Sequence, residues 1–520
     1  MNRSPSQFPR AFACAGFLTI ACAGIVAFDV TVGARGRAQT AGQDRQPDEG
    51  VSPSGFGRMF HLAAFAPESA RVEAALLEMG KRGGLLDAKD DLAAGPIALI
   101  VNPALSVNNP DSDHHTAGVT FMGQFLDHDM TFDVSSRLGQ PTNPRSATNG
   151  RRPFFDLDSV YGDGPTGSPL LYEPSDRAKL RVETGGRFED LPRDQTGRAI
   201  IADPRNDENL IIAGLHAAFL LFHNHAVDLV RRDHAAWSAD DVFAEARRLT
   251  RWHYQWIIVH EFLPLFVGSS MVEDIMANGR RFYAPREGEA YIPVEFQIAY
   301  RFGHSMVRPS YRANFTGNDG APFFAFVFDG TPSDAGEPAD LRGGARSSRR
   351  FVGWQTFFRF PGFEADVRPN KRIDTKLSTP LFDLPLGAIP AGTPPTSLAQ
   401  RNLLRHLTWR LPSGQAIAAA IGAPVLKDSE LVELRAIDPA FVSSTPLWYY
   451  VLKEAEVLEN GAHLGPAGGR IVAEVFIGLL QLDPESYLRS DPQFTPTLGG
   501  AIGDFHMTDF LTFAGVADKR

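Results

Sequence analysis

The chain is almost without cysteine: Cys14 and Cys22 are its only two among 520 residues, and both lie near the N-terminus. If that segment is removed as a signal peptide, the mature protein has no thiol. A disulfide framework, a disulfide-linked dimer and thiolate chemistry are then excluded, although non-covalent oligomers remain open.

An excess of positive charge is also lacking, with 51 Lys and Arg against 61 Asp and Glu and a net charge of −10. This balance argues against nucleic acid or an anionic membrane surface as a partner. Strand signals are few, and the sequence has no internal repeat. Tyr and Trp are scarce beside 38 Phe, a composition that suits a flat apolar cofactor and a plain core equally well.

The N-terminus has the pattern of an export signal. Arg3 and Arg10 precede an apolar run over residues 11–28, and small residues near Ala34 and Ala38 suit a cleavage site. We therefore expect a signal peptide or an N-terminal anchor over residues 1–38, a polar linker over 39–54, and a secreted or periplasmic protein. Contact with a membrane is expected only if this segment is not cleaved.

Apolar periodicity predicts a mainly α fold with few short strands, in one large domain over residues 55–520. Gly- and Pro-rich loops are expected over 139–153, 309–350 and 380–395. The predicted helices cover residues 72–86, 117–132, 210–230, 242–266, 291–307, 397–411, 429–460 and 469–480.

The most informative stretch is FMGQFLDHDMTFD, residues 121–133. On a helix, Gln124, Asp127 and His128 share one face, and burying such a face is costly unless something uses it. A lone histidine is more often a satisfied core residue. His223, in an apolar helix, is interpreted in that way.

Three further patterns lie downstream. Arg205 and Glu208 are three residues apart, a spacing that elsewhere marks a surface ion pair of little value. His304 follows Gly303, which permits close approach of a bulky group. Asn402 could orient a histidine by accepting its N–H. Each pattern alone is weak.

Together, in this order, the four motifs resemble the animal-type haem peroxidases of the peroxidase–cyclooxygenase superfamily. GQFLDHD is similar to the distal-histidine motif, and RNDE to the distal Arg-x-x-Glu. YRFGH resembles the segment of the proximal histidine, and LAQRN with its following LPSG resembles the proximal-asparagine segment.

The resemblance implies a haem b held by His304 as the proximal iron ligand. Asn402 would accept the other N–H of that imidazole and so tune the iron. Arg301 would pair with a haem propionate. Asp127 and Glu208 match the carboxylates that esterify the haem in mammalian relatives, so these links are possible here. Asn209 replaces the methionine that forms a sulfonium link in one relative, which excludes that third bond.

On the distal side, the resemblance implies that His128 accepts and returns a proton of hydrogen peroxide. Arg205 would stabilise the charge that develops as the O–O bond lengthens. Gln124 would hold water or a halide. The expected activity is haem-dependent peroxidase activity with an unidentified organic or halide donor.

A calcium site is implied as well. Its ligands would be the carboxylates of Asp129, Asp156 and Asp158 and the backbone oxygens of Arg152 and Phe154. The family usually has Thr where this chain has Arg152, so one side-chain oxygen is lost.

Two alternatives remain. Fatty-acid dioxygenases and cyclooxygenases carry a radical-forming Tyr three residues before the proximal histidine, where this chain has Arg301, with Tyr300 one place away. One place turns a helical side chain by about 100°. A non-catalytic adhesion module is expected to have lost His128, Arg205 or His304, and all three are present.

Overall fold

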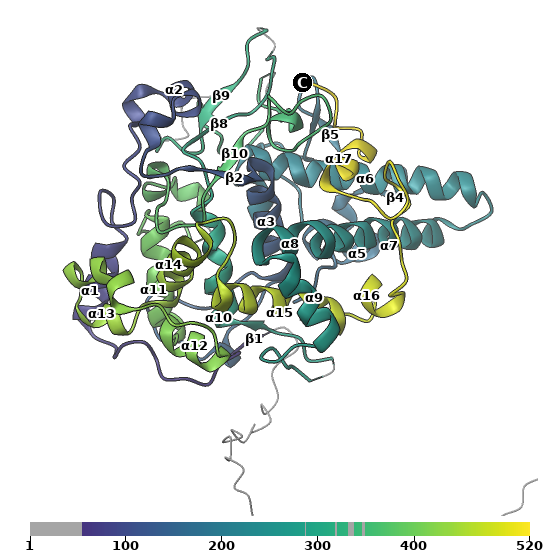
Figure 1. Cartoon of the computed structure of the whole chain (residues 1–520). Coiled ribbons are helices and arrows are strands. Elements are labelled where there is room, and N and C mark those ends of the chain that lie inside the picture. The colour runs from purple at the N-terminus through teal and green to yellow at the C-terminus, as the bar shows by residue number, and fades with distance from the viewer. Residues whose placement is uncertain (1–54, 287, 318–319, 331–336, 346–348, 390) are drawn as a thin grey trace, which may run out of the picture. The chain divides into compact units, whose positions relative to one another are not determined.

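Helices make up most of the regular secondary structure of the described chain, which confirms the predicted fold class (Figure 1). The computed structural model describes residues 55–520 except 287, 318–319, 331–336, 346–348 and 390. The predicted leader and linker lie outside these residues, and the domain boundary at residue 55 stays a prediction. The helices are α1 (Ala70–Met79), α2 (Pro96–Val101), α3 (Ala117–Met130), α4 (Asp158–Tyr161), α5 (Gly164–Gly167), α6 (Leu210–Asp233), α7 (Ala239–Ile257), α8 (Leu263–Val267), α9 (Ser269–Asn278), α10 (Val294–Ala299), α11 (Leu398–Trp409), α12 (Gly414–Ile421), α13 (Ala440–Ser443), α14 (Leu447–Glu459), α15 (Pro466–Leu482), α16 (Tyr487–Ser490) and α17 (Met507–Phe513).

The strands are short and, within the described residues, pair two by two. They fasten loops to the helices and form no layer of their own. The parallel pair is β1 (Phe56–Gly57) with β7 (Ile292–Pro293). The antiparallel pairs are β2 (Asp111–Thr116) with β10 (Pro369–Lys371), β3 (Tyr172–Glu173) with β4 (Asp176–Leu180), β5 (Glu183–Thr184) with β6 (Glu189–Asp190), and β8 (Ser310–Arg312) with β9 (Phe324–Phe326).

Helices α3, α6 and α15 lie in the core because they are apolar on nearly every side. Within the described residues, α6 alone is long and apolar enough to cross a membrane, but 83% of that stretch is buried in the protein. Its start is fixed by Asn209, whose side chain accepts the N–H groups of Ile211 and Ile212. His223 is a satisfied core residue, as predicted, with Tyr161 and the Ala178 carbonyl as partners.

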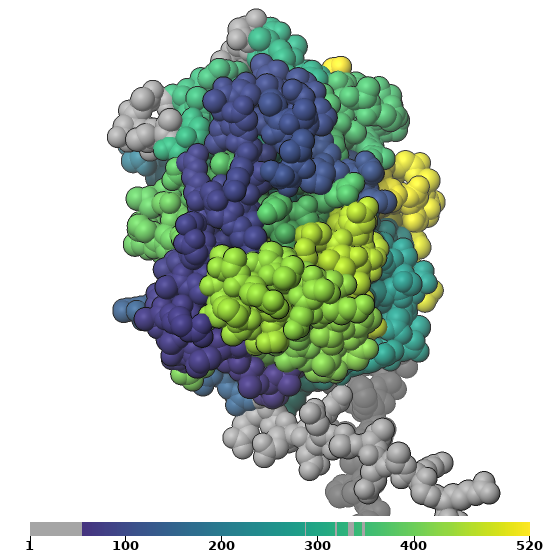
Figure 2. All heavy atoms as spheres, turned by 60° about the vertical axis from the view of Figure 1, so that its left-hand side comes forward, coloured from purple at the N-terminus to yellow at the C-terminus, as the bar shows by residue number. Residues whose placement is uncertain are grey.

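Distant parts of the sequence meet around this core. Figure 2 shows the first described segment lying against residues of the last third of the chain. Arg71 of α1, for example, forms an ion pair with Asp438 just before α13. Helices α3 and α11 are also far apart in the sequence, and both contribute residues to the cavity described below.

Three predicted helices are wrong in detail. The helix predicted over 72–86 ends at Met79, because Gly80 closes it. The segment 429–460 is interrupted at Pro439 and Pro446, which cannot continue a helix. The segment 291–307 begins as strand β7 and changes from α10 to a 3-10 helix over Tyr300–His304, so His304 lies on a 3-10 turn.

The helix predicted over 242–266 is continuous but contains a π-helical turn over Ile258–Phe262. Pro264 follows this turn and has no N–H to donate to residue 260, so the helix changes its hydrogen-bond register there. Phe262 reaches the cavity described below.

The tight packing at the start of α3 predicts the effect of one substitution. A Cβ at Gly118 would lie 2.5 Å from the Phe358 ring and 2.7 Å from the Phe357 carbonyl. Gly118→Ala should therefore lower the free energy of unfolding, measured in urea, by about 1–3 kcal/mol. Gly387→Ala is the matched control, since a Cβ there meets no atom within 4 Å; equal stability of the two variants would contradict this packing.

Candidate functional site

One cavity of about 520 Å³ collects all eight residues that the sequence predicts around the cofactor. They come from four separate parts of the chain: α3, the turn before α6, the 3-10 turn after α10, and α11. The cavity is lined by Gln124, Asp127, His128, Arg205, Glu208, Arg301, His304 and Asn402.

On the distal side, His128 is fixed as a neutral base. Its Nδ1 lies 2.9 Å from Oδ1 of Asn206, which accepts the Nδ1–H and leaves the lone pair on Nε2. Nε2 lies 3.9 Å from Oε1 of Glu208, which lines the same cavity. Burial, and then the charge of Arg205, lower the pKa of His128 to about 4, so the imidazole is neutral at pH 7.

Arg205 is held by a carboxylate beneath the cavity wall. Its Nε and Nη2 donate to the two oxygens of Asp203 at 3.0 and 2.7 Å, and Nη2 also donates to the His128 carbonyl at 3.1 Å. The guanidinium lies 4.2 Å from the centre of the Phe132 ring. Burial alone would raise the pKa of Asp203, but the charge and hydrogen bonds of Arg205 outweigh it and lower this pKa to about 2.

Gln124 and Glu208 form a second distal group. Gln124 Nε2 donates to Glu208, and Gln124 Oε1 accepts from Asn209 Nδ2 at 3.2 Å. Asn209 is also the N-cap of α6, so the position of Gln124 is tied to the start of that helix. Burial raises the pKa of Glu208 to about 8, with contributions from the charges of Asp203 and Asp127, so this carboxyl is largely protonated at pH 7.

On the proximal side, Nδ1 of His304 lies 2.7 Å from the amide of Asn402, with the amide nitrogen facing it. Oδ1 of Asn402 is buried and has no hydrogen-bond partner within the described part of the chain. Exchanging the amide oxygen and nitrogen resolves both points, because Oδ1 then accepts the Nδ1–H of His304. Burial, and then the charge of Arg301, lower the pKa of His304 to about 3, so it is neutral with a free Nε2 lone pair.

The 3-10 turn that carries His304 is anchored near its start to two helices. Tyr300 donates its hydroxyl to the Gly123 carbonyl of α3 at 2.8 Å, and Trp448 of α14 donates to the Arg301 carbonyl at 3.1 Å. A Cβ at Gly303 would meet no atom within 4 Å, so a flat group can approach the backbone there.

Arg301 brings a positive charge to this face. Its Nε is buried and has no hydrogen-bond partner among the described residues. Burial, and then the charge of Arg405, lower the pKa of Arg301 to about 10, so it still carries its charge at pH 7. A buried cation of this kind favours an anionic group in the cavity.

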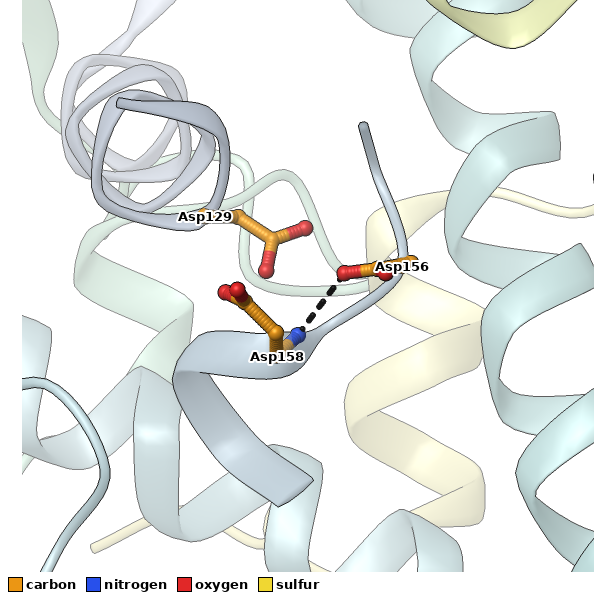
Figure 3. Close-up of side chains that lie close together, drawn as sticks. All are labelled: Asp129, Asp156 and Asp158. Atoms are coloured by element: carbon orange, nitrogen blue, oxygen red, sulfur yellow. Dashed lines mark hydrogen bonds between the residues drawn. The ribbon is translucent and has the colours of Figure 1, made fainter. Parts of the chain in front are cut away.

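A separate acidic triad, Asp129, Asp156 and Asp158, lies beside the distal face (Figure 3). One oxygen from each carboxylate lies within 4.8 Å of the others, and all three residues are buried. Burial, and then its two neighbours, raise the pKa of Asp129 well above its ordinary value, and burial followed by the charge of Asp156 raises the pKa of Asp158 to about 6. The predicted backbone ligands of Arg152 and Phe154 stay a prediction; the Arg152 carbonyl accepts the Phe154 N–H at 2.8 Å.

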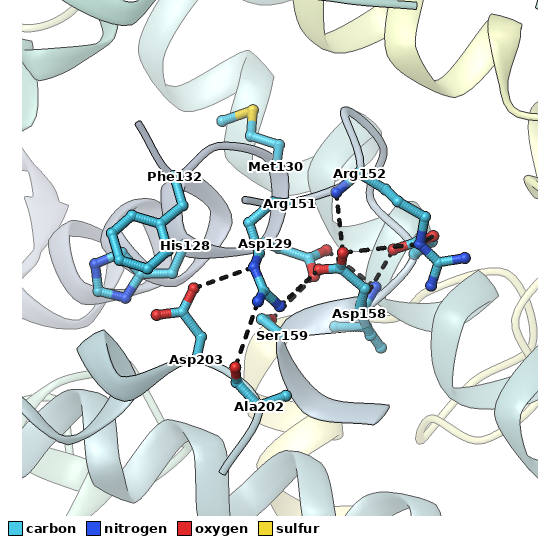
Figure 4. Close-up of polar contacts among 12 residues, drawn as sticks. His128, Asp129, Met130, Phe132, Arg151, Arg152, Asp158, Ser159, Ala202 and Asp203 are labelled. Carbon is cyan, nitrogen blue, oxygen red and sulfur yellow. Dashed lines mark hydrogen bonds and ion pairs between the residues drawn. The ribbon is translucent and has the colours of Figure 1, made fainter. Parts of the chain in front are cut away.

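Two arginines reach this triad (Figure 4). Nε of Arg152 lies 3.0 Å from Asp156 and 3.7 Å from Asp158. Arg151 donates to Asp158 at 3.2 Å, and its Nε lies 3.4 Å from Asp203. The guanidinium of Arg151 therefore contacts both the triad and Asp203, the carboxylate that holds Arg205.

Sequence reasoning missed Asp203, Asn206, His216 and Arg151. Two of these gave a signal that could have been used, because Asp203 and Asn206 lie beside Arg205 in the DPRNDE motif. His216 and Arg151 carry no such signal, since their roles arise only from contacts between separate segments.

Comparison with known proteins gives consistent matches. The sequence profile of animal haem peroxidases matches residues 133–322. Mouse eosinophil peroxidase is 29% identical over 187 residues, which cover 32% of this chain and 25% of that protein. Human thyroid peroxidase is 24% identical over 243 residues, 41% of this chain and 25% of that protein. The chain thus spans about a quarter of the length of these relatives.

Solved structures show the same fold over most of the chain. Peroxidase A from Dictyostelium discoideum aligns with a TM-score of 0.58 at 15% identity, covering 88% of this chain and 92% of that one. The fatty acid alpha-dioxygenase of Oryza sativa aligns with a TM-score of 0.52 at 13% identity, covering 83% and 78%.

The ion pair beneath the cavity predicts a pH-dependent loss of stability. Because the pKa of Asp203 falls from 3.8 to about 2 on folding, the pair stabilises the protein above about pH 4, and this contribution disappears as the pH falls towards 2. Asp203→Asn should cost about 2–3 kcal/mol of unfolding free energy at pH 7.

Urea unfolding at pH 7 and at pH 3 measures this difference, which should shrink at the lower pH. Asp233→Asn removes a carboxylate from an exposed pair with Arg232 and should cost less than about 0.5 kcal/mol. A cost at Asp203 that does not change with pH would contradict the assignment.

Proposed function

We propose that this chain is a haem-dependent peroxidase of the peroxidase–cyclooxygenase superfamily, which reduces hydrogen peroxide and oxidises an organic or halide donor. One observation carries the proposal. Two neutral histidines, His128 and His304, line the same cavity, and each has its Nδ1 tied to a buried asparagine. Both Nε2 lone pairs are therefore available, one for a metal and one for a proton.

The residues of the cavity fit haem b. Asn402 has an orphaned acceptor for the N–H of His304, the residue that would ligate the iron. Arg301 has an unused donor for a propionate, and the open space at Gly303 accepts a flat ring. The predominantly apolar side chains around these groups suit the rest of the macrocycle.

When bound, a haem would supply the iron at which peroxide is reduced. His128 then has the state of a general base, neutral with its Nε2 lone pair free, and it takes one proton from peroxide and gives it to the departing oxygen. Arg205 holds a positive charge in a water-poor wall and stabilises the negative charge on that oxygen.

Gln124, fixed by Glu208 and Asn209, holds the water or halide of the distal side. Asp127 and Glu208 line the same cavity and are the candidates for ester bonds to the haem. Haem that resists acid-acetone extraction after treatment with peroxide, and is extracted from an Asp127→Ala, Glu208→Ala double variant, would support these bonds.

The peroxidase activity is favoured over fatty-acid dioxygenation by the residues before His304. Position 301 holds an arginine, and the Tyr300 hydroxyl is engaged by the Gly123 carbonyl. The fold shared with a fatty acid alpha-dioxygenase does not distinguish the two reactions. The adhesion-module alternative is disfavoured because His128, Arg205 and His304 all line the cavity.

Calcium is the proposed ion of the acidic triad, since carboxylate oxygens are the ligands that it prefers. Arg152 competes with it, because its guanidinium already contacts two of the three carboxylates. Secretion or a periplasmic location also stays a proposal, since the N-terminal segment that predicts it lies outside the described residues.

The histidine assignments predict two separable losses. His304→Ala should abolish stable haem binding, because the iron loses its protein ligand. His128→Ala should keep the haem but slow the reaction with peroxide by about 10²–10⁴-fold. The measurement is the Soret absorption of haem-loaded protein, mixed with peroxide by stopped flow and then with an electron donor.

His463→Ala is the control, because His463 is partly exposed and does not line the cavity. An unmodified protein that gives no Soret band with stoichiometric haem would contradict the haem proposal. Peroxide turnover that persists in His128→Ala would instead remove only this histidine from the reaction.

The triad predicts that Arg152→Thr strengthens calcium binding. The substitution removes a competing cation and supplies a side-chain oxygen, so affinity should rise about tenfold, the equivalent of about 1.4 kcal/mol. Terbium luminescence can report binding, because Tyr254 donates to Asp129 at 3.1 Å and can sensitise the ion. The calcium affinity is then measured from the calcium concentration that displaces terbium.

Arg232→Thr, at an exposed position on α6, should leave the affinity unchanged. No terbium signal in either the unmodified protein or the Arg152→Thr variant would exclude a hard-cation site at the triad. Equal affinities of these two proteins would show that Arg152 does not compete.

A further inference from the structure

A buried hydrogen-bonded chain runs from the distal histidine away from the cavity. Asn206 Oδ1 lies 2.9 Å from His128 Nδ1, and Asn206 Nδ2 lies 2.9 Å from His216 Nδ1. His128 is 4% exposed, Asn206 is fully buried, and His216 is 1% exposed. His216 belongs to α6 and does not line the cavity, so its contact with the site passes through Asn206.

We infer that Asn206 is a positioning residue that sets the tautomer of His128, and that His216 in turn sets the orientation of the Asn206 amide. The inference rests on the proposed peroxidase function and deepens it. It assigns a role to two residues that do not touch the reacting atoms.

The direction of the chain follows from the donor and acceptor inventory. An amide has one acceptor side and one donor side, so the two histidines bound to Asn206 must be in opposite states at Nδ1. With Nδ2 donating to His216, Nδ1 of His216 carries the lone pair, and Nδ1 of His128 carries the hydrogen. His128 Nε2 is then the free acceptor that proton transfer requires.

Reversal of the amide would abolish this arrangement. Asn206 Nδ2 would face His128 Nδ1, which would then have to lose its hydrogen, and the proton of neutral His128 would move to Nε2. A base of that form cannot accept a proton from peroxide. Because Nδ2 faces His216 Nδ1 in the structure, the reversal would also require His216 to move its hydrogen to Nδ1.

Other charges around His128 are present in both arrangements. Burial lowers the pKa of His128 most, Arg205 lowers it further, and Asp203 and Asp127 raise it. Glu208 lies 3.9 Å from Nε2 on the cavity side. A test of these hydrogen bonds must therefore change the partner of His128 Nδ1 while leaving the charged groups in place.

The main variant is Asn206→Asp in the haem-loaded protein. A carboxylate accepts the Nδ1–H of His128 and stabilises the imidazolium, so the pKa of His128 should rise by about 1–3 units. Protonated His128 cannot act as a base, so the acid limb of the rate of peroxide reaction should move to higher pH by the same amount. The rate above that limb should stay close to that of the unmodified protein.

Cyanide binding supplies a second reading that needs no turnover. Hydrogen cyanide gives its proton to a distal base as the anion binds haem, so the acid limb of cyanide affinity, followed in the Soret band, should shift in parallel. Asn224→Asp is the matched control: it makes the same amide-to-carboxylate change near the centre of α6, where the Asn224 side chain contacts the Leu180 backbone. This control should shift the acid limb of neither the peroxide reaction nor the cyanide affinity.

If Asn206→Asp does not fold, two further variants test the hydrogen bonds that join His128, Asn206 and His216. Asn206→Ala removes the acceptor, and the rate should fall about tenfold without an upward shift of the acid limb. His216→Phe removes the partner of Nδ2, and the rate should fall several-fold with an unchanged resting Soret band.

The outcomes separate the two proposals. An unmodified protein that binds neither haem nor peroxide overturns the proposed function and this inference with it. A reactive protein whose variants at Asn206 and His216 keep the original rate and pH limbs overturns the inference alone. Lower thermal stability without any change in rate or limb would assign both residues a purely structural role.

Discussion

The distal half of the site depends on one buried ion pair. Burying a guanidinium without a counter-ion is costly, and Asp203, itself fully buried, meets Arg205 with both oxygens. Asp203 also accepts the backbone N–H of Arg205 and so starts the 3-10 turn over Pro204–Asp207. The same turn presents Asn206 and is followed by Glu208. One carboxylate therefore places the cation, the amide partner of His128 and the second carboxyl of the cavity.

The two sides of the cavity use the same device in different secondary structures. On the distal side a helix supplies His128 and a turn supplies its asparagine. On the proximal side the turn supplies His304 and helix α11 supplies Asn402. In both cases a buried amide occupies Nδ1, so that only Nε2 of the imidazole is available to another group. The chemical difference between the two imidazoles must then come from their neighbours, Arg205 on one side and Arg301 on the other.

Much of this site was predictable from the sequence. Helix α3 was predicted almost to its ends, because its apolar residues leave Gln124, Asp127 and His128 on one face. The turn around His304 was not, because a 3-10 turn has no distinct apolar period and is set here by Tyr300 and Trp448 from outside. The Asn206–His216 contact and the shared use of Arg151 were invisible for the same reason: both join segments that only the folded chain brings together.

The hydrogen bond from Tyr300 to the Gly123 carbonyl spans the two histidine-bearing elements. Its acceptor is a main-chain oxygen, which no side-chain replacement at position 123 can remove. The Tyr300 hydroxyl therefore couples the turn that carries His304 directly to the backbone of α3, and Tyr300→Phe is the smallest change that removes this coupling.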